Sequence, residues 1–355
     1  MINFDNKNVV IYAEGRFDST NAKVAASFIR YHADKCVAVI DSTKAGATCE
    51  EILGYGGNIP VVSDLPSTLD KQIDVFMIGN GLFHSDLPQE YRENIKRALE
   101  QKVHVVSGIH YRLAQDPELK ALADKMGVVI WDTKEPPAGL GTSQYKLLDI
   151  PQFIVHTVGS DCRVGKKNTA LEVTNYLNQQ GTETVFAAMG QSGIYITGKG
   201  IAIDAVPSDF VAGATEKLIL DSVSGSNAVV VLVEGQGSIT HPAYSAVTLG
   251  LLHGSMPHAL ILCHEANLEA HKNWEKTPLL SLNQLIDTYE TLGGYLRPCK
   301  VVGVSVNCKS LSDDEARDVI AQVEQDTGLP ATDVYKFGAQ KLADAVESFR
   351  NNKNK

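Results

Sequence analysis

The sequence predicts an α/β protein with two domains: a Rossmann-like N-terminal domain, then a mostly parallel α/β domain that carries a P-loop. Three observations support this. The length of 355 residues fits two domains at roughly 150 residues each. Short β-branched runs alternate with longer amphipathic stretches, as in βαβ units. A glycine-containing loop followed by lysine separates an apolar run from an amphipathic one near residue 160.

The first domain is predicted to span residues 1–145. No G-x-G-x-x-G follows its first apolar run, so we do not expect it to bind a dinucleotide. Residues 132–143 are rich in Pro, Gly and polar residues, which favours a linker and places the boundary near residue 145. We expect strands at 9–12, 36–40, 74–79, 103–107 and 128–131, and helices at 88–100 and 117–125.

The second domain is predicted to span residues 146–355 and to repeat the same alternation. The alternation again indicates βαβ units and a mostly parallel sheet. We expect strands at 153–159, 184–188, 228–233, 258–263 and 300–306, and helices at 166–179, 207–222, 243–253, 280–292, 312–324 and 338–350.

The composition narrows the class of partners. The formal net charge is −10 and no basic arm is present, which argues against nucleic acid. No run of about 18 apolar residues occurs, so we expect no membrane span. The N-terminus lacks signal-peptide features and the six cysteines are scattered, so we expect a cytoplasmic protein with reduced thiols. Small molecules are the expected partners, besides further copies of the chain in a homo-oligomer.

The P-loop candidate follows the apolar run that ends at Val158. In such a loop, backbone N–H groups surround a phosphate, the helix N-terminus adds partial positive charge, and a lysine neutralises the oxygens. The candidate cofactor-binding residues are Ser160, Asp161, Cys162, Arg163, Val164, Gly165, Lys166, Lys167 and Thr169.

Two departures from the usual G-x4-G-K-[ST] spacing decide the expected chemistry. Ser160 stands where the first glycine belongs, and Lys167 stands where a hydroxyl normally holds Mg²⁺. Lysine has no acceptor atom and repels the cation. Thr169 lies roughly 200° around the helix and cannot replace that hydroxyl. The loop is therefore predicted to bind phosphate without Mg²⁺, and we predict no metal site.

Further candidates follow the other apolar runs, because ligands of α/β sheets bind beyond the carboxyl ends of the strands. Glu234 ends one run and is a candidate general base, although a hydrogen-bonded structural carboxylate is the alternative. His241 and His264 are further catalytic candidates, and the backbone N–H groups of residues 190–193 or Gly235 could stabilise an oxyanion. The candidate substrate-binding residues are Gly190, Gln191, Ser192, Asp209 and Gln236.

Cys162 lies inside the loop, beside Arg163 and near a helix N-terminus. That setting is expected to lower the pKa of its thiol. A covalent role is one interpretation, and a tolerated small residue is the other.

Several motifs together resemble a bacterial P-loop family long described only as a domain of unknown function, whose better-understood members are D-glutamate (D-amino-acid) N-acetyltransferases. The motifs are Gly-Ser-Asp-Cys-Arg-Val-Gly-Lys-Lys at 159–167, those at 190–194, 203–210, 233–238, 241–242 and 251–260, and Ser-Gly-Ile-His at 107–110 in the first domain. The resemblance implies acetyl-CoA as co-substrate and an amino acid, D-glutamate or another D-amino acid, as acceptor. The loop would then hold the phosphates of CoA, with Lys167 as an added ligand.

The sequence leaves two alternatives open. The loop is also similar to that of dethiobiotin synthetase, which implies an ATP- and Mg²⁺-dependent ligase or kinase in which Glu234 or Asp209 holds the metal. There, however, threonine follows the lysine, where this chain has Lys167. The other alternative is a nucleotide- or CoA-binding protein without catalytic turnover.

Overall fold

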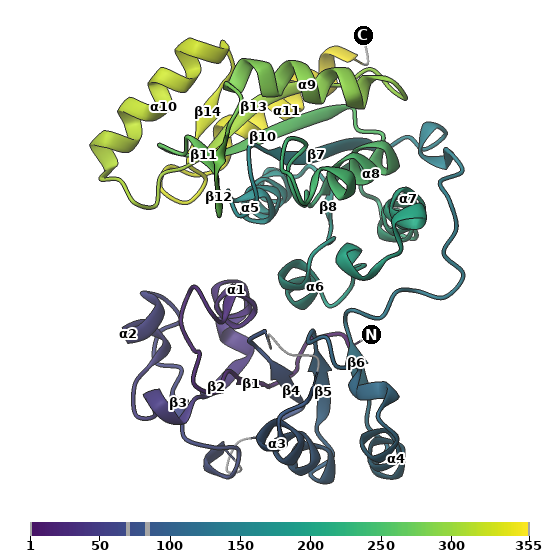
Figure 1. Cartoon of the computed structure of the whole chain (residues 1–355), viewed down its shortest axis with the longest axis vertical. Helices are drawn as coiled ribbons and strands as arrows, with labels where there is room; N and C mark the ends of the chain where they lie inside the picture. The colour runs from purple at the N-terminus through teal and green to yellow at the C-terminus, as the bar shows by residue number, and fades with distance from the viewer. Residues whose placement is uncertain (1, 69–71, 82–85, 354–355) are drawn as a thin grey trace. The chain divides into compact units, whose positions relative to one another are not determined.

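The computed structural model describes residues 2–68, 72–81 and 86–353. The chain forms two compact α/β units, which confirms the predicted fold class (Figure 1). The first unit contains residues 1–137 and 191–205, and the second contains residues 138–190 and 206–355. The segment 191–205 therefore packs with the first unit although it follows the P-loop in the sequence.

The first unit contains a six-stranded parallel sheet in the order β3-β2-β1-β4-β5-β6, the strand order of a Rossmann fold. The predicted strands are all present, whereas β3 is too short to give a periodic signal. The elements are β1 (Val9–Tyr12), α1 (Lys23–His32), β2 (Cys36–Ile40), α2 (Cys49–Leu53), β3 (Val61–Val62), β4 (Val75–Ile78), α3 (Gln89–Glu100), β5 (His104–Ser107), α4 (Pro117–Met126), β6 (Ile130–Asp132) and α6 (Gln191–Thr197).

Both faces of this sheet are covered, as the unbroken apolar strands predict. In β1, Val9 and Ile11 pack in one cluster with α1 and α2, whereas Val10 and Tyr12 pack in the other with α3 and α4 (Figure 1). Helix α6 packs against α1 and adds Tyr195, which is fully buried, to the first cluster. The first unit thus takes part of its core from a distant part of the sequence.

The second unit contains a parallel sheet in the order β14-β13-β10-β7-β9-β8. A separate antiparallel hairpin, β11–β12, was not predicted. The elements are β7 (Phe153–Gly159), α5 (Lys166–Gln179), β8 (Thr184–Ala187), α7 (Val211–Val223), β9 (Val230–Val233), α8 (Ser245–Ser255), β10 (Ala259–Glu265), β11 (Ala270–His271), β12 (Trp274–Pro278), α9 (Leu282–Gly294), β13 (Lys300–Asn307), α10 (Asp313–Thr327), β14 (Ala331–Thr332) and α11 (Gln340–Lys353).

Local signals explain where several helices begin and end. Ser281 caps α9 and Ser312 caps α10, each in a capping box with the residue three positions later. Gly328 ends α10 in the left-handed conformation. The helix expected to start at Pro207 instead begins with a short 3-10 turn at 208–210, and the α-helical hydrogen bonding starts at Val211.

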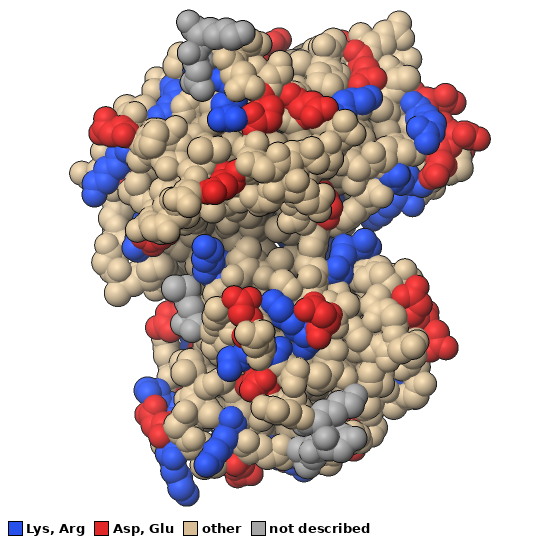
Figure 2. Space-filling model, turned by 180° about the vertical axis from the view of Figure 1, so that it is seen from behind, with Lys and Arg blue, Asp and Glu red and all other residues tan. Residues whose placement is uncertain are grey.

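The distribution of surface charge and the character of the helices agree with what the composition predicts. Acidic and basic side chains are interspersed over the face shown in Figure 2. Among the residues that the structure describes, no helix combines the length and the apolar character needed to cross a bilayer.

Candidate functional site

The P-loop candidate lies at the carboxyl end of β7, between β9 and β10, and a candidate residue lies at or near the carboxyl end of each of these strands. Strand β9 pairs with β7 on one side, with Val233 opposite His156, and β10 pairs with it on the other, with Cys263 opposite Gly159. The strand before Glu234 thus neighbours the strand before the loop. Glu234 therefore follows one of the two strands that flank the phosphate-binding candidate, and His264 lies near the carboxyl end of the other.

The start of α5 suits an anionic ligand. Gly165 has a φ of +112° and is the N-cap of α5, without a side-chain cap. The first N–H groups of a helix have no intrahelical acceptor, so the start of α5 presents donors. Gly235 lets β9 approach β7 closely, because a Cβ there would lie 1.7 Å from the carbonyl oxygen of Thr157.

Lys166 lies inside the loop. Its side chain is 6% exposed, and its Nζ donates to the carbonyl oxygen of Asp161 over 2.8 Å. Burial lowers the pKa of this lysine. A buried cation at a helix N-terminus strongly favours an anion, because an unpaired charge in the interior is costly.

Asp161 organises the loop from within. Its carboxylate is fully buried, accepts a hydrogen bond from the Lys272 amide over 2.8 Å, and lies 2.8 Å from Nδ1 of His271. Burial acts to raise the pKa of Asp161, but these hydrogen bonds outweigh it and the pKa is lowered. This carboxylate therefore ties hairpin β11–β12 to the loop, rather than facing a phosphate.

Asp161, His241 and His271 have donor atoms within 4.8 Å of one another, a spacing that a metal ion could span. Their hydrogen bonds argue against this use. Nδ1 of His241 accepts from the Ala243 amide over 3.1 Å, which places the proton of the neutral ring on Nε2, the nitrogen nearest to Asp161 at 3.8 Å. Nε2 of His271 lies 3.2 Å from the Thr240 hydroxyl. The three side chains form a hydrogen-bonded cluster, and the absence of a metal stays a prediction.

Glu234 is 3% exposed and its carboxylate accepts three hydrogen bonds. One oxygen accepts from the amides of Met189 and Gly190, each at 3.0 Å, and the other from the Gln236 side chain at 3.2 Å. Burial raises the pKa of this carboxyl, against the effect of these donors. The contacts match the structural alternative for Glu234, which fixes the turn after β8.

Two backbone amides that were candidates for stabilising an oxyanion already have hydrogen-bond acceptors. The Gly190 amide donates to Glu234, and the Gly235 amide donates to the Thr157 hydroxyl over 3.0 Å. Neither amide remains available to a developing negative charge. Sequence could not show this, because each acceptor lies more than 40 positions away in the chain.

His264 has a different environment. Its Nδ1 lies 2.9 Å from the Ser160 hydroxyl, and the ring is half-buried. Burial lowers the pKa of this imidazole, so the ring is neutral at pH 7. When Nδ1–H donates to Ser160, Nε2 carries the lone pair that a proton acceptor needs.

Two loop side chains differ from expectation. Burial raises the pKa of the Cys162 thiol although Lys166 opposes the rise, so the lowered pKa expected from the helix N-terminus is wrong. Thr169 is 1% exposed, and its hydroxyl donates to Ser305 over 2.7 Å and lies 3.5 Å from the Cys263 sulfur. Its side chain therefore packs within the sheet layer. Arg163 is exposed, whereas Val164 is buried.

The substrate candidates are divided between the units. Gly190 and Gln236 lie beside Glu234 in the second unit, where Asp209 is exposed on the turn before α7. Gln191 and Ser192 belong to α6 in the first unit, where the Gln191 side chain donates to the carbonyl oxygen of Gly108.

The family comparison agrees with this architecture. A model described as the DUF1611 P-loop domain matches residues 141–343, and one described as the DUF1611_N Rossmann-like domain matches residues 42–136. The chain belongs to the DUF1611 family.

Two relatives carry the name D-glutamate N-acetyltransferase. One, from Tritonibacter scottomollicae, is 38% identical over 93% of this chain and 95% of its own length. The other, from a Pseudoalteromonas species, is 33% identical over 92% of this chain and 94% of its own length. A crystal structure of a DUF1611 protein from Anabaena variabilis has a TM-score of 0.89 at 36% identity, covering 97% of this chain and 100% of that one.

This DUF1611 chain also contains site residues that the sequence did not suggest. The Tyr289 hydroxyl donates to the carbonyl oxygen of Gly159 over 2.7 Å and accepts from the Ile239 amide over 3.0 Å. Tyr289 thereby links α9 to the start of the loop. It occupies an ordinary apolar position of an amphipathic helix, and no local signal distinguishes it.

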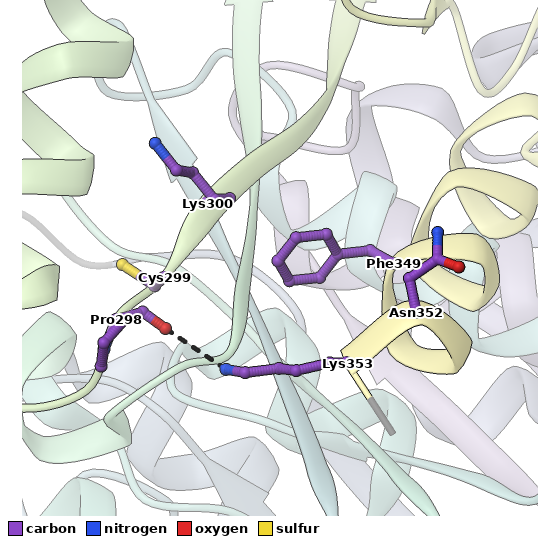
Figure 3. Close-up of a pocket in the computed structure, with 6 residues that line it drawn as sticks. All are labelled: Pro298, Cys299, Lys300, Phe349, Asn352 and Lys353. Carbon is purple, nitrogen blue, oxygen red and sulfur yellow. Dashed lines mark hydrogen bonds between the residues drawn. The ribbon is translucent and has the colours of Figure 1, made fainter. Parts of the chain in front are cut away.

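A hollow of about 250 Å³ lies elsewhere in the second unit. Figure 3 shows Phe349 and Lys353 of α11 extending toward residues 298–300, where β13 begins, with Lys353 donating to the carbonyl oxygen of Pro298. The amino end of a parallel strand is the edge away from the ligand-binding end. The hollow is thus separate from the P-loop.

Proposed function

We propose that this chain is an N-acetyltransferase that moves the acetyl group of acetyl-CoA to the amino group of an amino acid, with D-glutamate as the first acceptor to test. Two relatives named D-glutamate N-acetyltransferase match this chain over almost their whole length. The P-loop candidate supports a phosphate-bearing co-substrate, and CoA carries a pyrophosphate and a 3′-phosphate.

The single observation that carries the choice of co-substrate is Lys167 at the start of α5, directly after the buried Lys166. Two adjacent cations suit a ligand with several phosphates. They do not suit Mg²⁺, which a P-loop holds through a hydroxyl at the position of Lys167. CoA needs no metal because no bond at phosphorus breaks during acetyl transfer.

The reaction requires a proton acceptor. The substrate ammonium loses a proton, its amine attacks the thioester carbonyl, and the carbon–sulfur bond breaks to release CoA as a thiol and the N-acetylated amino acid. We assign the acceptor to His264, because it is neutral and only half-buried beside the loop. Glu234 then holds the turn at Met189 and Gly190, and His241 supports the Asp161 cluster.

A thermal-shift panel tests the co-substrate. Acetyl-CoA at 100 times its dissociation constant is expected to stabilise the protein by about 2.7 kcal/mol, and Mg²⁺ to add nothing. Thiol release should accompany incubation of acetyl-CoA with D-glutamate, with L-glutamate as the stereochemical control. Stabilisation that requires ATP and Mg²⁺ together would overturn the proposal in favour of a ligase or kinase. Acetyl-CoA binding without acetyl transfer to any amino acid would favour a non-catalytic binding protein.

A further inference from the structure

Two exposed aromatic side chains lie beside the P-loop. Tyr244 is 50% exposed and Trp274 is 45% exposed, and both rings pack against the buried ring of His241. The centroids of His241 and Tyr244 are 4.8 Å apart, and those of His241 and Trp274 are 6.0 Å apart. Single exposed aromatics are common on surfaces, but two around one buried histidine form a local cluster.

This cluster is fixed to the loop. His241 lies 3.8 Å from the Asp161 carboxylate, and its ring packs edge-on against His271 with centroids 5.0 Å apart. His271 pairs with Trp274 across the β11–β12 turn, and the adjacent Lys272 amide donates to Asp161. One histidine thus separates Asp161 from each exposed aromatic ring.

We propose that Tyr244 and Trp274 form a stacking surface for the adenine ring of the ligand whose phosphates the P-loop holds. In an adenine nucleotide, one ribose separates the base from the phosphates, so a surface that binds the base has to lie close to the phosphate site. Aromatic side chains bind bases through their π-faces. The hydrogen bonds of Asp161 to His271 and Lys272 fix the hairpin that carries Trp274, and the ring of Tyr244 packs against His241. Naming CoA as the ligand rests on the proposed function, whereas the stacking surface applies to any adenine nucleotide.

Calorimetric titration of variants tests this surface. Trp274→Ala is expected to weaken binding of CoA and ADP roughly 5- to 150-fold, the range for loss of one base–aromatic stack. Trp274→Phe should retain most of the affinity. Pyrophosphate, which has no base, should bind Trp274→Ala and the unmodified protein equally. Tyr295→Ala, which removes a 71% exposed tyrosine at the end of α9, is the matched control.

Fluorescence gives a second readout. The chain has two tryptophans, so Trp131→Phe leaves Trp274 as the only one. CoA and ADP should quench its emission, whereas phosphopantetheine should not. Unchanged affinity of Trp274→Ala for both adenine ligands would overturn the stacking surface and leave the acetyltransferase proposal intact. Binding of ADP but not CoA, with the same dependence on Trp274, would retain the surface and overturn CoA as the ligand. Binding of neither to the unmodified protein would overturn both.

Discussion

At the residue scale, the two adjacent lysines of the loop have different surroundings. Lys166 is buried and contacts a loop carbonyl, whereas Lys167 is half-buried on the first turn of α5. The sequence predicted a lysine near the phosphates from spacing alone. It could not predict that Asp161 turns inward, because the hairpin that holds this carboxylate lies about a hundred positions further along the chain.

Lys166→Met removes the buried charge and keeps most of the side-chain volume. We expect acetyl-CoA affinity to fall by about 1.5–3 kcal/mol, the range for a charged hydrogen bond, as measured by calorimetric titration. Lys309→Met, which changes an exposed lysine, is the control and should bind normally. Equal affinity in both variants would show that the loop is not the phosphate site.

His264→Gln tests the proton acceptor. A glutamine amide at position 264 cannot take up the ammonium proton, so turnover should fall by about 10²–10⁴-fold while acetyl-CoA affinity changes little. Steady-state acetyl transfer and a separate binding titration measure the two effects.

Glu234→Gln tests the structural role of Glu234 and is compared with His264→Gln. The amide places a donor next to the Gln236 amide, so we expect a loss of about 1–3 kcal/mol in unfolding free energy and a smaller loss of turnover than in His264→Gln. The reverse order of the two turnover losses would return the base role to Glu234, as the sequence suggested.

At the element scale, the long apolar strands were predictable because their side chains are buried on both faces. The two-residue strands β3 and β14 give no periodic signal. Hairpin β11–β12 was missed for another reason. Its second strand is largely exposed and polar, and its position depends on Asp161 rather than on an apolar face.

Strand β7 carries a pH-sensitive group of its own. His156 is 1% exposed, 2.7 Å from the Ser255 hydroxyl, and burial lowers its pKa to about 3. Below pH 6.5, His156 is protonated in the unfolded chain but stays neutral in the folded chain. The contribution of His156 to the free energy of unfolding is therefore fully present above pH 6.5. It is lost as the pH falls toward 3, by about 1.4 kcal/mol per pH unit.

Denaturant unfolding of the protein and of His156→Gln at pH 7, 6 and 5 measures this share. The variant is expected to lose stability less steeply between pH 6 and 5. Parallel slopes in the two proteins would mean that His156 takes up its proton without unfolding.

At the scale of the whole molecule, the order of elements in the sequence does not match their division into units. The composition of residues 132–143 predicted a boundary near residue 145, whereas segment 191–205 resembles an ordinary connection after β8. Its packing with the first unit includes Tyr195, which is fully buried in the first apolar cluster. Contacts so distant in sequence leave no local pattern.

This division predicts how fragments behave. Residues 138–355 expressed alone would expose the side chains of Ile194, Tyr195 and Ile196, which are buried in the intact chain. Each such side chain contributes about 1.5–3 kcal/mol when buried, so we expect self-association by size-exclusion chromatography. Replacing the three with Ser should make the fragment monodisperse. A fragment that is monodisperse without these replacements would contradict the expectation.

Segment 191–205 also affects how the protein folds while the ribosome synthesises it. The ribosome releases the six strands of the first sheet early, but the helix that completes one of its apolar faces is made only after β7, α5 and β8. At roughly 5–20 residues per second, the interval lasts on the order of several seconds. During that time the nascent first unit leaves an apolar surface uncovered, which a chaperone can recognise, and the first unit can finish folding only when synthesis of the second has begun.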